Sequence, residues 1–251
     1  KPSMVKNNAS PSRDSSTPSA PRSALLPTFG QIFLVALIFW CSACASSTDQ
    51  TGHPGITGVR QKNPDTLVAN QNLVTGIRAV NDNGTINVIV EVPAGTNEKW
   101  EVNEEGVMVR EFTGDKPRVI RYLPYPGNYG MIPRTLLDPK DGGDNAPLDA
   151  IVLGSSVPRG HVIKAYPIGV LRMLDGGEQD DKILAVQADS HFKSALDVEK
   201  LEEQFPGSVP ILKTWFSNYA GKSQQIVLGF GSRASAIQII SIASKSFEAR
   251  N

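Results

Sequence analysis

The stretch Tyr122–Leu153, YLPYPGNYGMIPRTLLDPKDGGDNAPLDAIVL, organises the chain. Its first half combines proline, glycine, asparagine and aromatic residues, which predicts a stiff, loop-like backbone. Its second half places four aspartates just before a short apolar strand: Asp138, Asp141, Asp144 and Asp149. Clustered carboxylates suit hard cations such as Mg²⁺, which binds a few carboxylates together with substrate phosphates. The stretch therefore predicts a site for a hard cation beside the start of a strand.

The composition restricts the class of protein. The chain has 251 residues, of which 40% are hydrophobic, and its formal net charge is zero. That length is sufficient for one domain with a sizeable core. The neutral charge argues against a nucleic-acid partner, which would favour a basic excess. The only cysteines are Cys41 and Cys44, so the rest of the chain has neither a disulfide framework nor a thiolate metal site.

The N-terminal part resembles a targeting segment. A basic, Ser- and Pro-rich start precedes the apolar run FGQIFLVALIFWCSACA, residues 29–45, which predicts a signal or anchor segment over residues 1–45. Ser-Ala before Cys44 resembles the end of a bacterial lipobox and predicts a lipid anchor there, with a simple secretory signal or a membrane anchor as alternatives. Such a leader places the protein in the cell envelope, periplasmic or membrane-anchored; otherwise the location is cytoplasmic. The polar residues 46–80 read as a flexible linker, and a folded domain is expected over residues 81–251.

Within that domain, ordered structure is expected to begin near Ile86. Short β-branched segments predict strands at residues 86–92, 99–102, 107–110, 119–122, 150–153, 162–174, 183–186 and 225–228. Helical periodicity follows at residues 197–205, 210–219 (with Pro210 at the first helical position) and 234–249. Many short strands followed by helices predict an α+β domain with a small closed or twisted β-barrel.

Four groups of residues carry potential chemistry. They are the aspartate loop, the segment DGGEQDDK (residues 175–182), the charged residues Glu91, Lys99 and Glu101 within strand patterns, and the tyrosines of YPGNYG, Tyr125 and Tyr129. Each group alone is explained by an ordinary turn, edge strand or structural aromatic. Together, acids and cationic or phenolic donors suit a polyphosphate held between metal ions and Lys, Arg and Tyr side chains.

These motifs, in this order, resemble family I soluble inorganic pyrophosphatases. The resemblance rests on INVIVEVPAG, EKWEV, YPGNYG, PLDAIVLG, IGVLRMLDGGEQDDKILAV and WFSNY, and covers residues 86–249. It implies an OB-like five-stranded β-barrel flanked by C-terminal helices. It also implies Mg²⁺-dependent hydrolysis of inorganic diphosphate to two phosphates, several Mg²⁺ ions per site, and a homo-oligomer.

The resemblance also implies roles for individual residues. The expected metal ligands are Asp144, Asp149 and Asp180, with Asp175 joining around metals that arrive with the substrate. Glu91 and Glu101 resemble acids that hold metal-bound waters, and Tyr125 an aromatic that orients the acids. The expected phosphate-binding residues are Lys99, Arg110, Tyr129, Lys182 and Tyr219, with Arg118 or Arg121 as alternatives to Arg110.

Two positions depart from the family pattern. The loop normally reads Asp-x-Asp-Pro-apolar-Asp, but here Ala146 replaces the middle acid, which accepts a proton from the nucleophilic water. Because a positioned general base contributes about 10²- to 10⁴-fold in rate, activity is expected to be attenuated. Three interpretations are open: an inactivating substitution in a natural or engineered variant, a natural slow enzyme, or a displaced base such as Asp141. The second departure is Ala220, where the family usually has a Lys, for which Lys222 is a candidate substitute.

Two other functions compete with an attenuated diphosphatase. A non-catalytic Mg²⁺–diphosphate or polyphosphate binding protein would use the retained ligands without turnover. An OB-like module for single-stranded nucleic acid is disfavoured by the neutral charge and the acidic site.

Overall fold

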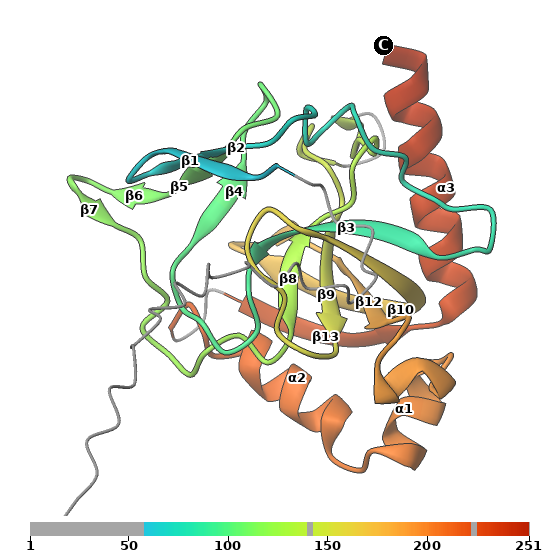
Figure 1. The fold of residues 1–251 in the computed structure, drawn as a ribbon. Coiled ribbons are helices and arrows are strands. Elements are labelled where there is room, and N and C mark those ends of the chain that lie inside the picture. The colour runs from blue at the N-terminus through green and yellow to red at the C-terminus, as the bar shows by residue number, and fades with distance from the viewer. Residues whose placement is uncertain (1–57, 140–142, 222–224, 251) are drawn as a thin grey trace, which may run out of the picture. The chain divides into compact units, whose positions relative to one another are not determined.

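The computed structural model describes residues 58–139, 143–221 and 225–250. The expected leader, Cys44, Asp141 and Lys222 therefore lie outside the described residues. Within the described part, five strands pair in a closed ring, in the order β10–β12–β9–β8–β3 and back to β10 (Figure 1). These strands are β3 (Ile86–Val92), β8 (Asn128–Met131), β9 (Asp149–Leu153), β10 (Val162–Asp175) and β12 (Lys182–Gln187).

One pairing in the ring is parallel and the others are antiparallel. Strands β9 and β12 run parallel, with Ile183 opposite Ala150. The long strand β10 pairs with β3 near its start, where Ala165 lies opposite Ile86, and with β12 through its middle, from Ala165 to Leu171. A register shift between Pro167 and Gly169 bends β10, so one strand serves both neighbours.

Further strands flank the ring. The short β11 (Glu178–Gln179) and the longer β13 (Gln225–Gly231) both pair with β10. A separate sheet has the order β1–β2–β5–β4, formed by Arg60–Asn63, Thr66–Val68, Met108–Arg110 and Trp100–Val102. A small hairpin pairs β6 (Phe112–Thr113) with β7 (Lys116–Pro117).

The separate sheet corrects the predicted linker. Residues 60–68, expected to be a flexible tether, form strands β1 and β2, and the Leu73 side chain is only 1% exposed. Leu73 packs with Trp100 and Met108, and its N–H donates to the Gly106 carbonyl at 3.1 Å. The side chains of β1 are all exposed. Backbone pairing and a few scattered apolar contacts order this segment, so its sequence shows no regular hydrophobic pattern from which strands could be predicted.

Two further strand predictions need correction. Residues 119–122 make only an isolated bridge between Val119 and Glu98. Conversely, strand β8 lies inside YPGNYG and was expected to be a loop. A Cβ added to Gly130 would lie 1.8 Å from the Ile89 carbonyl oxygen, so glycine permits the close approach of β8 and β3. The motif therefore contains a buried strand whose turn-like composition reflects tight packing.

The helices follow the predicted periodicity closely. They are the 3-10 helix η2 (His191–Ser194), α1 (Val198–Gln204), α2 (Ser208–Phe216) and α3 (Arg233–Arg250). The Asp197 carboxylate caps α1 by accepting from the Lys200 N–H at 2.6 Å. Helix α2 begins at Ser208, so Pro210 is its third residue and not its first. In α3 the predicted apolar positions are buried: Ala236, Ile240, Ala243 and Phe247.

The two faces of β9 and β12 contact different helices. On one face Ile151 and Leu184 pack with residues of α1 and α2, including Leu212 and Trp215. On the other face Ala150 and Ile183 pack with α3, which runs along the ring in Figure 1. Because side chains alternate along a strand, these two strands present separate surfaces to the α2 and α3 sides. Among the described residues, no helix is both long and apolar enough to cross a bilayer.

Candidate active site

The site is centred on two residues that begin neighbouring parallel strands. Asp149 is the first residue of β9 and Lys182 is the first residue of β12. Each directly precedes one member of the opposed pair Ala150 and Ile183. The Lys182 ammonium lies 2.6 Å from Asp149 Oδ2 and also forms an ion pair with the Asp180 carboxylate. Lys182 is only 3% exposed. The two carboxylates therefore face one shared, buried cation.

Tyr129 adds a hydroxyl donor to the same carboxylate. It lies opposite Ile151 on β8, diagonal to Asp149, and its Oη donates to Asp149 Oδ2 at 2.5 Å. Burial raises the pKa of Tyr129, and the neighbouring Asp149 charge raises it further, so the hydroxyl keeps its proton at neutral pH. Burial also opposes ionisation of Asp149, but Lys182 and Lys99 outweigh it and lower the pKa of that carboxyl. Asp149 is therefore ionised. Its negative charge is stabilised by the Lys182 and Lys99 charges and by the hydrogen bond from Tyr129.

A second cationic group lies beside Tyr129. The Lys99 ammonium is 5.0 Å from the Tyr129 ring centroid and 3.2 Å from Glu111 Oε1. Glu111 Oε2 accepts from the Arg118 guanidinium at 2.5 Å. Burial acts against both ions of the Lys99–Glu111 pair, yet the pKa of Glu111 is lowered by Lys99 and Arg118. Glu111 thus holds two cations next to the tyrosine.

Arg110 does not join this cluster. It lies opposite Trp100 on the β4–β5 ribbon, whereas Glu111 follows it on the other face. Its guanidinium is 5.0 Å from the Trp100 ring and within 3.7 Å of Glu98 Oε2. The expectation for Arg110 therefore shifts to Arg118, one of the two alternatives. The other alternative, Arg121, is exposed.

Glu91 and Glu101 both lie in the electrostatic field of Lys99. Glu91 is 4% exposed and accepts from the Val102 N–H at 2.8 Å. Burial raises the pKa of Glu91 to about 8, although the Lys99 charge opposes the shift. Glu101 is exposed, and burial together with the Glu111 charge raises its pKa. Glu91 is therefore a proton-holding acid near neutral pH.

An aromatic wall closes the side toward α2. The Tyr125 ring lies 5.2 Å from Tyr129 and 4.5 Å from Trp215, and Trp215 stacks on Tyr219 at 4.7 Å with an interplanar angle of 4°. Trp215 Nε1 donates to the Leu123 carbonyl at 2.8 Å. Burial raises the pKa of Tyr219, as do the charges of Asp180 and Asp175, while Lys182 opposes them. The wall thus brings the Tyr219 hydroxyl into the electrostatic field of the Lys182 cluster.

The aspartate loop is less closely integrated. Asp144 is exposed, and its Oδ1 accepts from the Ala146 N–H at 3.0 Å. Asn145, between them, has φ +70°, a left-handed conformation that asparagine tolerates. Asp175 ends β10 and is exposed. Among the described residues, neither Asp144 nor Asp175 hydrogen bonds to Asp149, and Ala146 offers only a methyl group.

The donor set matches a hard cation in its chemistry. Asp149 and Asp180 converge on one cation, here the Lys182 ammonium, and carboxylate oxygens are the ligands that Mg²⁺ prefers. Burial and the negative charges of Asp149 and Asp175 raise the pKa of Asp180, whereas the Lys182 charge acts to lower it. An added cation would reduce the repulsion between these carboxylates. Within residues 58–139, 143–221 and 225–250, no three acids or histidines are already arranged as a metal site. The residues fit the metal as a carboxylate pair formed by Asp149 and Asp180.

The sequence missed one member of the site. Glu111 pairs with both Lys99 and Arg118, and no sequence motif distinguishes it from the neighbouring exposed acids. Trp215 was assigned to the apolar face of its helix, and its stacking on Tyr219 could not be seen without the fold.

The fold and this site define a class: an α+β domain built on a closed ring of five strands, in which carboxylates, lysines and tyrosines share one buried cluster. The family model for inorganic pyrophosphatase matches residues 88–248. The chain belongs to the family I soluble inorganic pyrophosphatases.

Similar proteins support that membership. Soluble inorganic pyrophosphatase 1, chloroplastic, from Chlamydomonas reinhardtii is 38% identical over 148 residues, covering 54% of this chain and 52% of the relative. The mitochondrial inorganic pyrophosphatase of Saccharomyces cerevisiae is 37% identical over 161 residues, covering 55% and 52%. The chain thus spans about half the length of the curated relatives it matches.

Solved structures show the same fold. The inorganic pyrophosphatase from Schistosoma japonicum aligns with a TM-score of 0.64 at 27% identity, covering 75% of this chain and 74% of that one. The type I inorganic pyrophosphatase from Toxoplasma gondii aligns with a TM-score of 0.65 at 26% identity, covering 72% and 89%.

Proposed function

We propose that the chain hydrolyses inorganic diphosphate to two phosphates with Mg²⁺, at a rate reduced by the alanine at position 146. The observation that carries this proposal is the convergence of Asp149 and Asp180 on the Lys182 ammonium. The Tyr129 hydroxyl donates to the same Asp149 carboxylate, and Lys99 lies beside the Tyr129 ring. Membership of the pyrophosphatase family supports the substrate. The closed five-strand ring is in this proposal the OB-like β-barrel of the family.

The cations and hydroxyls of the site would bind the substrate. Diphosphate is densely anionic, and Lys99, Arg118 and Lys182 provide positive charge around one cluster. Tyr129 and Tyr219 keep their protons at neutral pH because their pKa values are raised, so both can donate to phosphoryl oxygens. Preorganised donors of this kind stabilise charge that develops on a departing phosphate.

Asp149 and Asp180 would hold Mg²⁺, with Asp144 and Asp175 reaching it from the loop and from the end of β10. When bound, Mg²⁺ neutralises phosphoryl oxygens and lowers the pKa of coordinated water. Glu91 and Glu101 both interact electrostatically with Lys99 and would orient water at the rim through their carboxyl groups. The number of ions follows the family expectation of several per site.

The missing general base sets the expected rate. Ala146 cannot accept a proton, and its backbone N–H is already bonded to the Asp144 carboxylate. A positioned base contributes about 10²- to 10⁴-fold. We therefore infer slow hydrolysis, in which the proton leaves to solvent or to a neighbouring carboxylate.

Phosphate release from diphosphate with Mg²⁺ tests the proposal, comparing the chain with Ala146→Asp. The variant should be about 10²- to 10⁴-fold faster, because it restores the base. Ala249→Asp, which adds the same charge at an exposed position of α3, is the matched control and should not change the rate. A folded Ala146→Asp protein that binds Mg²⁺ yet releases no phosphate would overturn the proposal.

The same experiment separates the alternative function. If the unsubstituted chain binds diphosphate tightly by calorimetry and shows no turnover, while Ala146→Asp is active, the natural role is binding of Mg²⁺–diphosphate or polyphosphate. Ala146 is the observation that favours this second candidate.

Assembly and location are further proposals. Family membership supports a homo-oligomer, which light scattering coupled to gel filtration tests directly. The leader pattern in residues 1–45 supports a cell-envelope location with a lipid anchor at Cys44. Fractionation with labelled lipid tests this, and Cys44→Ser is the control that should abolish incorporation.

A further inference from the structure

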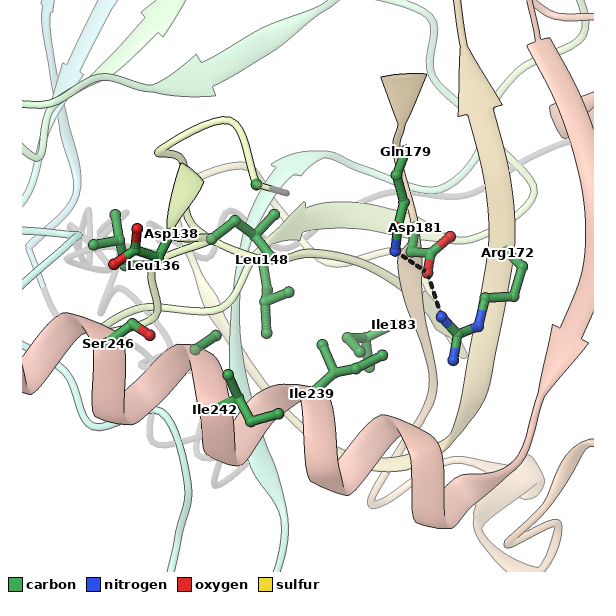
Figure 2. A pocket seen from close by; sticks show the side chains of 13 residues that line it. Leu136, Asp138, Leu148, Arg172, Gln179, Asp181, Ile183, Ile239, Ile242 and Ser246 are labelled. Carbon is green, nitrogen blue, oxygen red and sulfur yellow. Dashed lines mark hydrogen bonds and ion pairs between the residues drawn. The ribbon is translucent and has the colours of Figure 1, made fainter. Parts of the chain in front are cut away.

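A cavity of about 180 Å³ lies between helix α3, the loop that precedes β9 and the start of β12 (Figure 2). Its walls are mostly aliphatic, and its main apolar residues are Leu136, Leu148, Ile183, Ile239 and Ile242. Figure 2 shows Ile239 and Ile242 rising from α3 toward Leu148, which lies across the cavity. The space is therefore bounded by side chains from α3, from the loop before β9, and from β10, β11 and the start of β12.

The cavity lies on the opposite face of the strands that carry the proposed active site. Asp149 and Lys182 point to the α2 side, and their neighbours Leu148, Asp181 and Ile183 line the cavity on the α3 side. Alternation of side chains along β9 and β12 produces this separation. The cavity is therefore distinct from the diphosphate site, although the same backbone forms both.

One end of the cavity is polar but electrically balanced. Asp181 Oδ2 accepts from the Arg172 guanidinium at 2.8 Å and from Gln179 Nε2 at 2.9 Å, and Asp181 Oδ1 accepts from the Met173 N–H at 3.0 Å. In Figure 2 Arg172 and Gln179 converge on Asp181 from two sides. Because the guanidinium and carboxylate already neutralise each other, this end offers hydrogen bonding to a ligand without a net charge to match.

Size and lining together restrict the ligand. A cavity of about 150 Å³ lined by aliphatic and aromatic side chains is known to bind benzene. The present space is similar in size and apolar in its body, with polar groups at the Arg172–Asp181 end and, away from that end, at Asp138 and Ser246 (Figure 2). An anion such as diphosphate does not suit aliphatic walls, because its desolvation is costly.

We propose that this cavity binds an uncharged, single- or fused-ring aromatic molecule whose N–H or O–H donor reaches Asp181 or Gln179. This inference does not depend on the proposed function, because it concerns a different face of the ring. Asp181 lies between Asp180 and Lys182 in sequence, so an occupied cavity would contact the segment that positions both.

The test uses indole and the full chain in an NMR titration of backbone amides. Indole should shift the amides of Ile239, Ile242, Ser246 and Asp181, and leave those of β1 and β2 unchanged. Ser246→Phe places a ring at the cavity lining and should weaken binding by at least about tenfold. Ser241→Phe, the same substitution at an exposed site of α3 outside the lining, is the matched control and should bind as the unsubstituted chain does.

A second variant helps to distinguish loss of binding from misfolding. Ile242→Trp also fills the cavity lining, from a side chain that is 47% exposed and so tolerates enlargement. Loss of indole binding in both variants, with folding unchanged by circular dichroism, supports the site. Absence of saturable shifts, or shifts centred instead on Leu123, Ile211 and Thr214 at the shallow pocket beside α2, would overturn it.

Discussion

The ammonium of Lys182 lies 2.6 Å from the Asp149 carboxylate, and the two residues begin parallel neighbouring strands. Strand pairing fixes this relationship, because the register that places Ile183 opposite Ala150 also places Lys182 beside Asp149. The same ammonium contacts Asp180, so one side chain holds together the acids proposed to bind Mg²⁺.

Lys182→Met should destabilise the metal-free protein by about 2–4 kcal/mol, because two partly buried carboxylates lose their shared cation. Mg²⁺ should restore part of that loss, since a cation that binds only the folded state stabilises it. Thermal unfolding with chelator and with Mg²⁺ measures both effects. Lys164→Met, at an exposed position of β10, is the control. Equal stability of Lys182→Met and Lys164→Met in chelator would contradict the shared-cation interpretation.

Arg118 and Arg110 should differ in their effect on catalysis. In the Ala146→Asp background, Arg118→Met should lower kcat/KM by about 10²- to 10³-fold, because Arg118 lies beside Glu111 and Lys99. Arg110→Met should leave it nearly unchanged, because Arg110 contacts Trp100 and Glu98 on the other face. Steady-state kinetics on both folded variants gives the comparison. The reverse order of effects would restore the role first expected for Arg110.

Glu91 should make the metal-free protein less stable as the pH rises. Burial raises its pKa from 4.5 to about 8, so between those values the folded state holds a proton that the unfolded chain has lost. The free energy of unfolding therefore falls with rising pH across this window. Glu91→Gln removes the titration, and its stability should decline less from pH 5 to 8. Urea unfolding at several pH values in chelator measures the difference, and parallel curves for the two proteins would refute the shift.

Leu73 tests the extended N-terminal boundary of the domain. Leu73→Ala should lower the free energy of unfolding by about 2–5 kcal/mol, since Leu73 is buried against Trp100 and Met108. Val80→Ala, at a side chain that is 44% exposed, should have a much smaller effect. Chemical denaturation compares them. If both substitutions were neutral, residues 60–80 would behave as the linker that the sequence suggested.

The sequence predicts the position of those site residues that lie next to a recognisable strand. Asp149 and Lys182 directly precede the predicted apolar strands 150–153 and 183–186, so their placement at strand starts follows from the sequence pattern, whereas their roles and that of Asp180 rest on the family resemblance. Glu111 and its partner Arg118 could not be assigned in that way. The pairing of β4 with β5 decides whether Arg110 or the next residue, Glu111, faces Lys99. A one-residue change in register reverses the face.

The sequence by itself determined the α+β class, the buried face of α3, the family resemblance and the missing acid at position 146. These features depend on residue identity and short-range periodicity, which can be read directly from the sequence. Tertiary structure alone decided that β1 and β2 belong to the domain, that Arg118 and not Arg110 pairs with Glu111 beside Lys99, and that a cavity lies behind Asp149 and Lys182. Each of these depends on pairings between segments distant in the chain, whose register and facing side chains are set by packing.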